Sequence, residues 1–251
     1  MNNDRPKICA LSGNALKIIA AVSMLIDHIG VIFCPDVTIL RILGRIAFPI
    51  FAFMISEGCR YTRNKLRYFL TVSCMGVAYL VVFYLYSGVI YMSIFITFSL
   101  SIIMIYALQA FKKACFAENV SVINIVFLGI VFATTVAFSS AMNEIFAIDY
   151  GFFGSLAPLL ASLFHKPEGC SNIVFAKLDS RLISLLGLSI ALIGLYVVYG
   201  GFRIYALLSI PLLLLYSGKR GKRKMKYFFY IFYPSHILIL EGIYILLQAI
   251  K

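Results

Sequence analysis

Long apolar runs separated by short polar connections dominate the sequence. A transmembrane helix needs about 20 mainly apolar residues, and most of these runs approach that length. We therefore predict about nine transmembrane helices. The sixth, containing Asp149, and the eighth, containing Pro211, are only just long enough. The runs cover residues 15–34, 39–59, 67–87, 89–110, 120–139, 146–164, 181–200, 202–217 and 226–248.

The composition indicates a membrane protein and excludes a soluble globular domain. The chain has 251 residues, of which 62% are hydrophobic and 13% are charged. We find no internal repeat or low-complexity segment, so we expect a single all-α polytopic membrane domain over residues 1–251. The six cysteines are scattered without a C-x-x-C pair, which favours neither a disulfide framework nor a metal site.

The clustering of basic residues predicts the orientation of the chain. The net charge is +12, and most basic side chains lie in alternate connections between the runs. By the positive-inside rule these connections face the cytoplasm, so the N-terminus is cytoplasmic and the C-terminus extracytoplasmic. Anionic membrane lipid is an expected partner, whereas loop charges without a soluble fold argue against nucleic acid. The basic connections lie within residues 60–67, 112–113, 166–181 and 219–226.

The first apolar run contains ionisable residues, which are costly inside a membrane and are therefore functional candidates. Lys17 and His28 are 11 residues apart. That is about three turns, so they share a helix face and lie about 16 Å apart. Asp27 lies about 100° around the helix from His28 and need not share its surroundings. The alternative is that His28 is a structural histidine satisfied by a neighbouring helix.

The second run also contains polar residues. Pro49 is expected to kink this helix and to free the carbonyl of Arg45, an arrangement suited to lining a cavity. Arg45 is alternatively structural, paired with Asp27 or with Asp149 of the sixth run. Glu57 is predicted near the cytoplasmic end of the second run.

The last run places His236 about 15 Å from its start, near the middle of the membrane. Pro234 loosens the helix just before this histidine, and Glu241 follows it. Two histidines at similar depth, each beside an acidic or kinked position, favour chemistry over packing. His165 differs, because it lies at a predicted cytoplasmic helix end beside Lys166, where we expect it to be solvated.

Four segments of the sequence resemble the TraX family across nearly the whole chain. They read ALKIIAAVSMLIDHIG, LRILGRIAFPIFAFMISEGCRYTRN, DYGFFG and LLLLYSGKRGKRKMKYFFYIFYPSHILIL. That family is named for a protein that acetylates the N-terminus of pilin. The first run also resembles integral membrane acyltransferases, in which a basic residue precedes a histidine at the spacing of Lys17 and His28. The resemblance implies a bacterial cell-membrane enzyme that uses acetyl-CoA as acyl donor and needs no metal.

The acyl-transfer hypothesis assigns roles to the polar residues. Cations would bind the CoA phosphates. His28 would act as general base or be transiently acylated, Asp27 would orient it only if the helix is distorted, and His236, Arg45 or Tyr233 could stabilise the oxyanion. The acceptor is an amine or a hydroxyl, in a small molecule or a peptide. The candidate sets are His28, Asp27 and His236 for catalysis, Lys17, Arg45, Arg60, Arg63, Lys219 and Arg220 for acyl-CoA, and Glu57, Asp149 and Tyr233 in support.

Two other classes of function fit some of these residues. A proton-coupled transporter or flippase would use Asp27, His28, Glu57 and His236 as a proton relay. The absence of a repeat relating two halves argues against this class. An assembly protein without chemistry would not need so many intramembrane ionisable groups.

Overall fold

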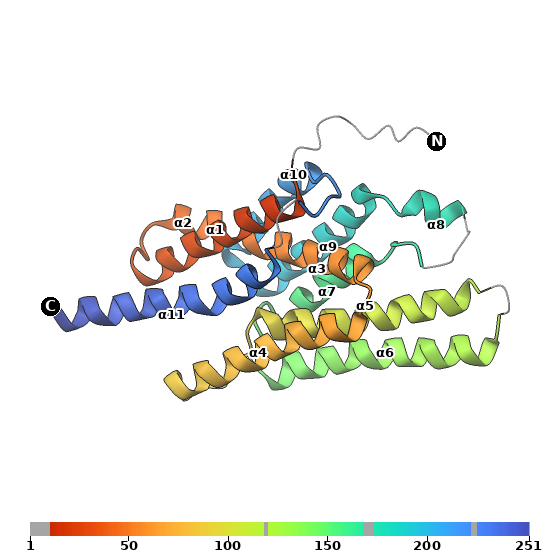
Figure 1. The fold of residues 1–251 in the computed structure, drawn as a ribbon, viewed down its shortest axis with the longest axis horizontal. Helices are drawn as coiled ribbons and strands as arrows, with labels where there is room; N and C mark the ends of the chain where they lie inside the picture. Colours follow the sequence, from red (N-terminus) through yellow and green to blue (C-terminus); the bar gives the residue numbers. More distant parts are fainter. Residues whose placement is uncertain (1–10, 118–119, 168–172, 222–224, 251) are drawn as a thin grey trace. The chain divides into compact units, whose positions relative to one another are not determined.

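The computed structural model describes residues 11–117, 120–167, 173–221 and 225–250, and these residues are helical with no strand among them (Figure 1). Part of the predicted basic connection 219–226, residues 222–224, lies outside this set. The long helices are α1 (Gly13–Ile32), α3 (Ala47–Tyr61), α4 (Lys65–Ser87), α5 (Ile94–Cys115), α6 (Val122–Ile145), α9 (Arg181–Tyr199) and α11 (Lys226–Ile250). The shorter ones are α2 (Thr38–Gly44), α7 (Gly151–Ser162), α8 (Ile173–Leu178), the 3₁₀ helix η1 (Gly201–Leu208) and α10 (Ser209–Leu214).

Seven helical segments within the described residues are long and apolar enough to cross a membrane, taking α2 and α3 together. This result confirms the prediction of an all-α polytopic membrane protein. The sixth and eighth predicted runs fold as shorter apolar helices, α7 over Gly151–Ser162 and η1–α10 over Gly201–Leu214. A residue with positive φ directly precedes each of these short helices, and the turn that it makes limits the helix length. The residue is Tyr150 before α7 and Gly200 before η1, each at φ 62°.

The chain divides into two compact units, Met1–Met54 with Tyr196–Lys251 and Ile55–Leu195. The single domain predicted over the whole chain stays a prediction. The first unit contains α1, α2, η1, α10, α11, the start of α3 and the end of α9, and the second contains the rest of the helical residues.

In the first unit, α1 and α2 form an antiparallel hairpin. A Cβ atom on Gly44 would overlap the Asp27 side chain, and one on Gly30 would lie 2.8 Å from Leu40 Cβ. The two glycines therefore permit the close approach of these helices. The hydroxyl of Ser23 donates to the carbonyls of Leu43 and Gly44 at the end of α2.

The break in the second predicted span falls at Arg45 and Ile46, between α2 and α3. Pro49 was expected to interrupt a continuous helix, but it lies in the first turn of α3. A backbone N–H has no helical partner at that position, so proline costs little there.

Helices α1 and α11 run side by side in the same direction (Figure 1). Their contacts follow in order along both helices: Lys17 with Phe229, then His28 with His236, then Phe33 with Tyr244. This parallel pairing places the two intramembrane histidines of the sequence opposite each other.

In the second unit, α5 is the most buried of the candidate spans, with 61% of its apolar stretch buried inside the protein. Its polar residues contact the carbonyls of α7 and its flanks. The hydroxyl of Thr97 donates to the Asp149 carbonyl at 2.6 Å, and that of Ser101 to the Ser155 carbonyl at 2.8 Å. Helix α7 therefore runs parallel to α5, starting from the level at which α5 begins.

Candidate functional site

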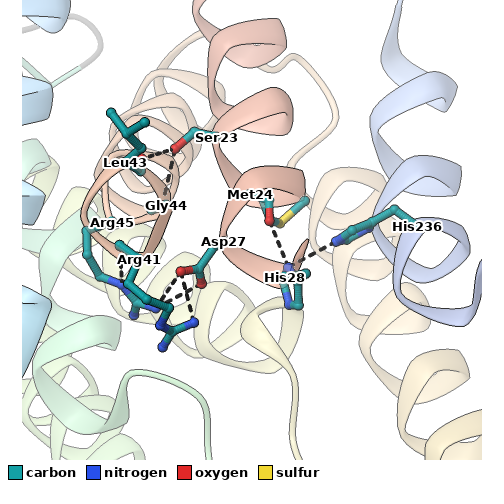
Figure 2. Close-up of polar contacts among 9 residues, drawn as sticks. All are labelled: Ser23, Met24, Asp27, His28, Arg41, Leu43, Gly44, Arg45 and His236. Atoms are coloured by element: carbon teal, nitrogen blue, oxygen red, sulfur yellow. Dashed lines mark hydrogen bonds and ion pairs between the residues drawn. The ribbon is translucent and has the colours of Figure 1, made fainter. Parts of the chain in front are cut away.

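The imidazole rings of His28 and His236 meet edge to face at the α1–α11 interface (Figure 2). Their centroids are 4.9 Å apart with an interplanar angle of 77°. Nε2 of His236 lies 3.3 Å from Nδ1 of His28. His236 is only 4% exposed, and Phe232, one turn earlier on α11, stacks on it with centroids 4.9 Å apart. The two histidines, 208 positions apart in sequence, thus form one site.

The hydrogen bonds of this pair define its protonation. Nδ1 of His28 lies 2.8 Å from the Met24 carbonyl, and Nδ1 of His236 lies 2.8 Å from the Phe232 carbonyl. A carbonyl oxygen only accepts, so each Nδ1 carries the proton and each neutral ring has a bare Nε2. His236 Nε2 is then an acceptor toward His28 Nδ1–H. Within the described residues, both hydrogen bonds of the His28 ring use Nδ1, and none engages Nε2.

Asp27 points away from His28 and toward α2 (Figure 2). Arg45 donates to both carboxylate oxygens at 2.9 and 2.8 Å, and Arg41 donates to Oδ1 at 2.9 Å. The three side chains are 14, 12 and 26% exposed for Asp27, Arg45 and Arg41. Of the two structural partners predicted for Arg45, Asp27 is one that it contacts. The triad holds α2 against α1 and gives Asp27 no part in orienting the imidazole.

A cationic end of α1 lies at its first turns. Ser12 caps the helix, its hydroxyl accepting from the Ala15 N–H at 3.2 Å. The Gly13 N–H donates to the Lys219 carbonyl at 2.8 Å, and the Asn14 N–H to the Arg220 carbonyl at 3.0 Å. These bonds fix the loop after α10 onto the start of α1.

The side chains of Lys219 and Arg220 are exposed on that fixed loop. Lys17 lies one turn into α1, close enough to Arg220 for the two charges to repel, with its Nζ 5.8 Å from the Phe229 ring centroid. Three of the predicted phosphate-binding cations are therefore gathered at one end of α1, and an anion would relieve their repulsion.

Tyr233, a predicted supporting residue, is 9% exposed, and its ring meets the His236 ring edge to face at 5.7 Å between centroids. Four other predicted site residues lie in the second unit. Arg60 forms a bidentate ion pair with Asp179 at 2.8 and 2.6 Å, and Arg63 is exposed between α3 and α4. Glu57 lies on α3, and Asp149 lies before α7. The pKa of Tyr91 is raised, chiefly by burial of its hydroxyl and in addition by the Asp149 carboxylate.

His165 is buried, contrary to the prediction that it is solvated. It is 4% exposed, its Nε2 lies 3.3 Å from the Ser184 hydroxyl, and its carbonyl accepts from Lys112 Nζ at 3.2 Å. Burial chiefly, with the charges of Arg60 and Lys112 adding and Asp179 opposing, lowers the pKa of His165 to about 4. The neighbouring Lys166 suggested solvent, but α9 covers the ring.

Within the described residues, no three His, Cys, Asp or Glu side chains gather as metal ligands. The fold and the site define an integral membrane protein with paired imidazoles between two of its helices and a cationic cluster at the end of one of them.

The chain belongs to the TraX family, because the family model for TraX protein matches residues 12–244. This match confirms the resemblance found in the sequence. Over 238 residues, 93% of this chain and 96% of the relative, it is 25% identical to the "Probable fimbrial assembly protein FimC, serogroup H1" of Dichelobacter nodosus. Over 52 residues, 21% of either chain, it is 46% identical to the "Uncharacterized protein RP591" of Rickettsia prowazekii (strain Madrid E). No solved structure matches the chain.

Proposed function

We propose that this protein is a membrane acyltransferase that moves an acetyl group from cytoplasmic acetyl-CoA to an amine or hydroxyl acceptor. The observation that carries the proposal is the bare Nε2 of His28, on the same helix as Lys17 and held by His236. The helix thus carries a proton acceptor for general base catalysis and, at its first turns, cations suited to phosphate.

The donor would lie along the interface between α1 and α11. Lys17, Lys219 and Arg220 would bind the CoA phosphates at one end, and the rise of α1 places His28 about 16 Å farther along. An extended pantetheine arm has a comparable length. Aromatic rings of α11 follow this interval, since Phe228 stacks on Phe232 and Phe232 on His236.

In the reaction, the acceptor nitrogen or oxygen attacks the thioester carbon and its proton passes to Nε2 of His28. The carbon–sulfur bond then breaks, and the proton returns to the CoA sulfur. Atoms and charges balance, since acetyl-CoA and acceptor give acetylated acceptor and CoA thiol. General base catalysis of this kind contributes about 10²–10⁴-fold to the rate.

We further propose that the acceptor is a peptide N-terminus. The name of the D. nodosus relative assigns that protein to fimbrial assembly, and the relative aligns with nearly all of this chain. Fimbrial subunits are peptides that a membrane enzyme would meet at or across the membrane.

We propose nine crossings of a bacterial cell membrane, with the N-terminus cytoplasmic. Two contacts support counting α7 as a crossing: the Thr97–Asp149 bond at the start of α5 and the Lys112–His165 bond near its end. Two contacts likewise support counting the η1–α10 segment as a crossing. At its start, η1 packs on α2, which follows the end of α1, and after its end Tyr216 pairs with Leu11, just before α1. Both short segments would thus traverse the depth of a long neighbour.

The proposal is tested with purified protein and radiolabelled acetyl-CoA. Released CoA is measured by mass spectrometry and not with thiol reagents, because these would also react with the free cysteines of the protein. A short peptide with a free α-amine serves as acceptor, and the same peptide with a blocked N-terminus is the control. His28→Ala should keep acetyl-CoA binding and lose at least about 100-fold in turnover. Near-normal turnover of this variant, or no binding of acetyl-CoA by the wild type, would refute the proposal.

Lys17→Ala should show the opposite pattern. Loss of a charge-assisted phosphate contact weakens binding about 10- to 150-fold, with less effect at saturating donor. The matched control is Lys113→Ala, which removes an exposed lysine of the second unit. Acetyl-pantetheine lacks the nucleotide phosphates, so its binding should not change. If Lys17→Ala weakens both donors equally, the lysine does not bind phosphate.

A further inference from the structure

The role of His236 follows from the direction of its hydrogen bonds. Its Nδ1–H is used by the Phe232 carbonyl, and its Nε2 faces Nδ1 of His28. A neutral His236 therefore presents a lone pair, not an N–H, to the site. A group that stabilises an oxyanion must donate, so the geometry does not support the oxyanion role considered from the sequence.

We propose that His236 is a positioning residue, resting on the proposed acyl transfer, that accepts from Nδ1–H of His28 beside the Met24 carbonyl and stabilises the imidazolium formed when Nε2 takes the acceptor proton. Nδ1–H of His28 is shared between two acceptors, the Met24 carbonyl and His236 Nε2. Both attract the charge that His28 gains in the reaction. The proton on Nδ1 stays there throughout, because transfer to His236 would leave a lone pair facing the Met24 carbonyl.

Packing makes His236 suited to this role. The ring is 4% exposed and stacked nearly parallel on Phe232, at 6°, while Tyr233 meets its edge. Such contacts hold the lone pair in one direction, and a fixed acceptor needs no reorganisation as charge develops. Among the described side chains, the charged groups on the surrounding elements of this unit are Lys17 and Asp27 on α1, Arg41 on α2, Arg45 directly after α2, Arg203 on η1 and Glu241 on α11.

Two substitutions separate positioning from packing. His236→Phe keeps the stacked ring and removes the acceptor, so kcat should fall about 10- to 150-fold while the KM for acetyl-CoA stays within about twofold. His236→Gln offers a carbonyl acceptor at the same reach and should recover most of kcat. Ser235→Ala is the matched control, because that hydroxyl donates only within α11, to the Ile231 and Phe232 carbonyls. Thermal stability of each variant shows whether it folds.

Nitrogen NMR of histidine-labelled protein gives a readout that packing would not move. The chain has only three histidines, so each signal can be assigned by substitution. We expect the Nδ1–H form for His28 and His236 in the wild type. In His236→Phe, the Nδ1 signal of His28 should shift, because its N–H has lost one of its two acceptors. The inference would be overturned by full kcat in His236→Phe, or by a loss of kcat in His236→Gln as large as that in His236→Phe. An Nε2–H form of His28 in the wild type would also overturn it. A folded His28→Ala variant with normal turnover would instead overturn acyl transfer itself.

Discussion

Asp27→Asn should destabilise the first unit, because it removes the carboxylate that pairs with both Arg41 and Arg45. Asparagine keeps the shape and one acceptor oxygen but leaves two guanidinium charges close together at 12 and 26% exposure. Breaking a buried ion pair costs about 3–5 kcal/mol. Partial exposure places the expected loss near the lower end, at about 3 kcal/mol.

The assay is thermal unfolding of purified protein in one detergent. For a chain of this size, a loss of about 3 kcal/mol lowers Tm by about 6–12 °C. The matched control is Asp36→Asn, the same chemical change at an exposed position between α1 and α2, which should stay within about 0.5 kcal/mol of wild type.

A double variant tests the reason for the loss. Asp27→Asn with Arg45→Gln removes both members of this ion pair, so its destabilisation should be smaller than the sum of the two single effects. The turnover of Asp27→Asn, corrected for folded protein, should stay near wild type because the carboxylate faces α2. Equal Tm values for Asp27→Asn and Asp36→Asn would refute the structural role of the triad.

Two further predictions concern the second unit. The first uses single cysteines at three exposed positions, in a background without native cysteines. An impermeant thiol reagent applied to intact cells should label Ser87→Cys but neither Lys113→Cys nor Lys166→Cys. Labelling at position 166 would mean that α7 does not cross the membrane. Because burial lowers the pKa of His165 to about 4, the unfolded chain binds the extra proton first as pH falls. Stability should then drop by up to about 3 kcal/mol between pH 6.5 and pH 4, and remain intact above that window. His165→Gln should flatten this dependence in a thermal-unfolding series, and an unchanged slope would contradict it.

The sequence alone determined the features that depend on local chain geometry. Apolar length predicted helices that cross a membrane, and helical periodicity put Lys17 and His28 on one face and Asp27 on another. The motifs around these residues also predicted the family. The sequence also singled out the sixth run, with Asp149, and the eighth, with Pro211, and these two runs fold as the shorter apolar helices.

Tertiary structure decided which polar groups meet. The parallel packing of α11 on α1 pairs His236 with His28, and Gly44 lets α2 bring Arg45 and Arg41 to Asp27. His165 is buried because α9 covers it through Ser184, although the adjacent Lys166 is exposed. Periodicity gives the face on which a side chain lies, but its partner is set by helix packing between segments distant in sequence. The tautomer of each histidine is local, because its Nδ1 faces the carbonyl four residues earlier on its own helix, but only the assembled helices bring Nε2 of His236 to His28.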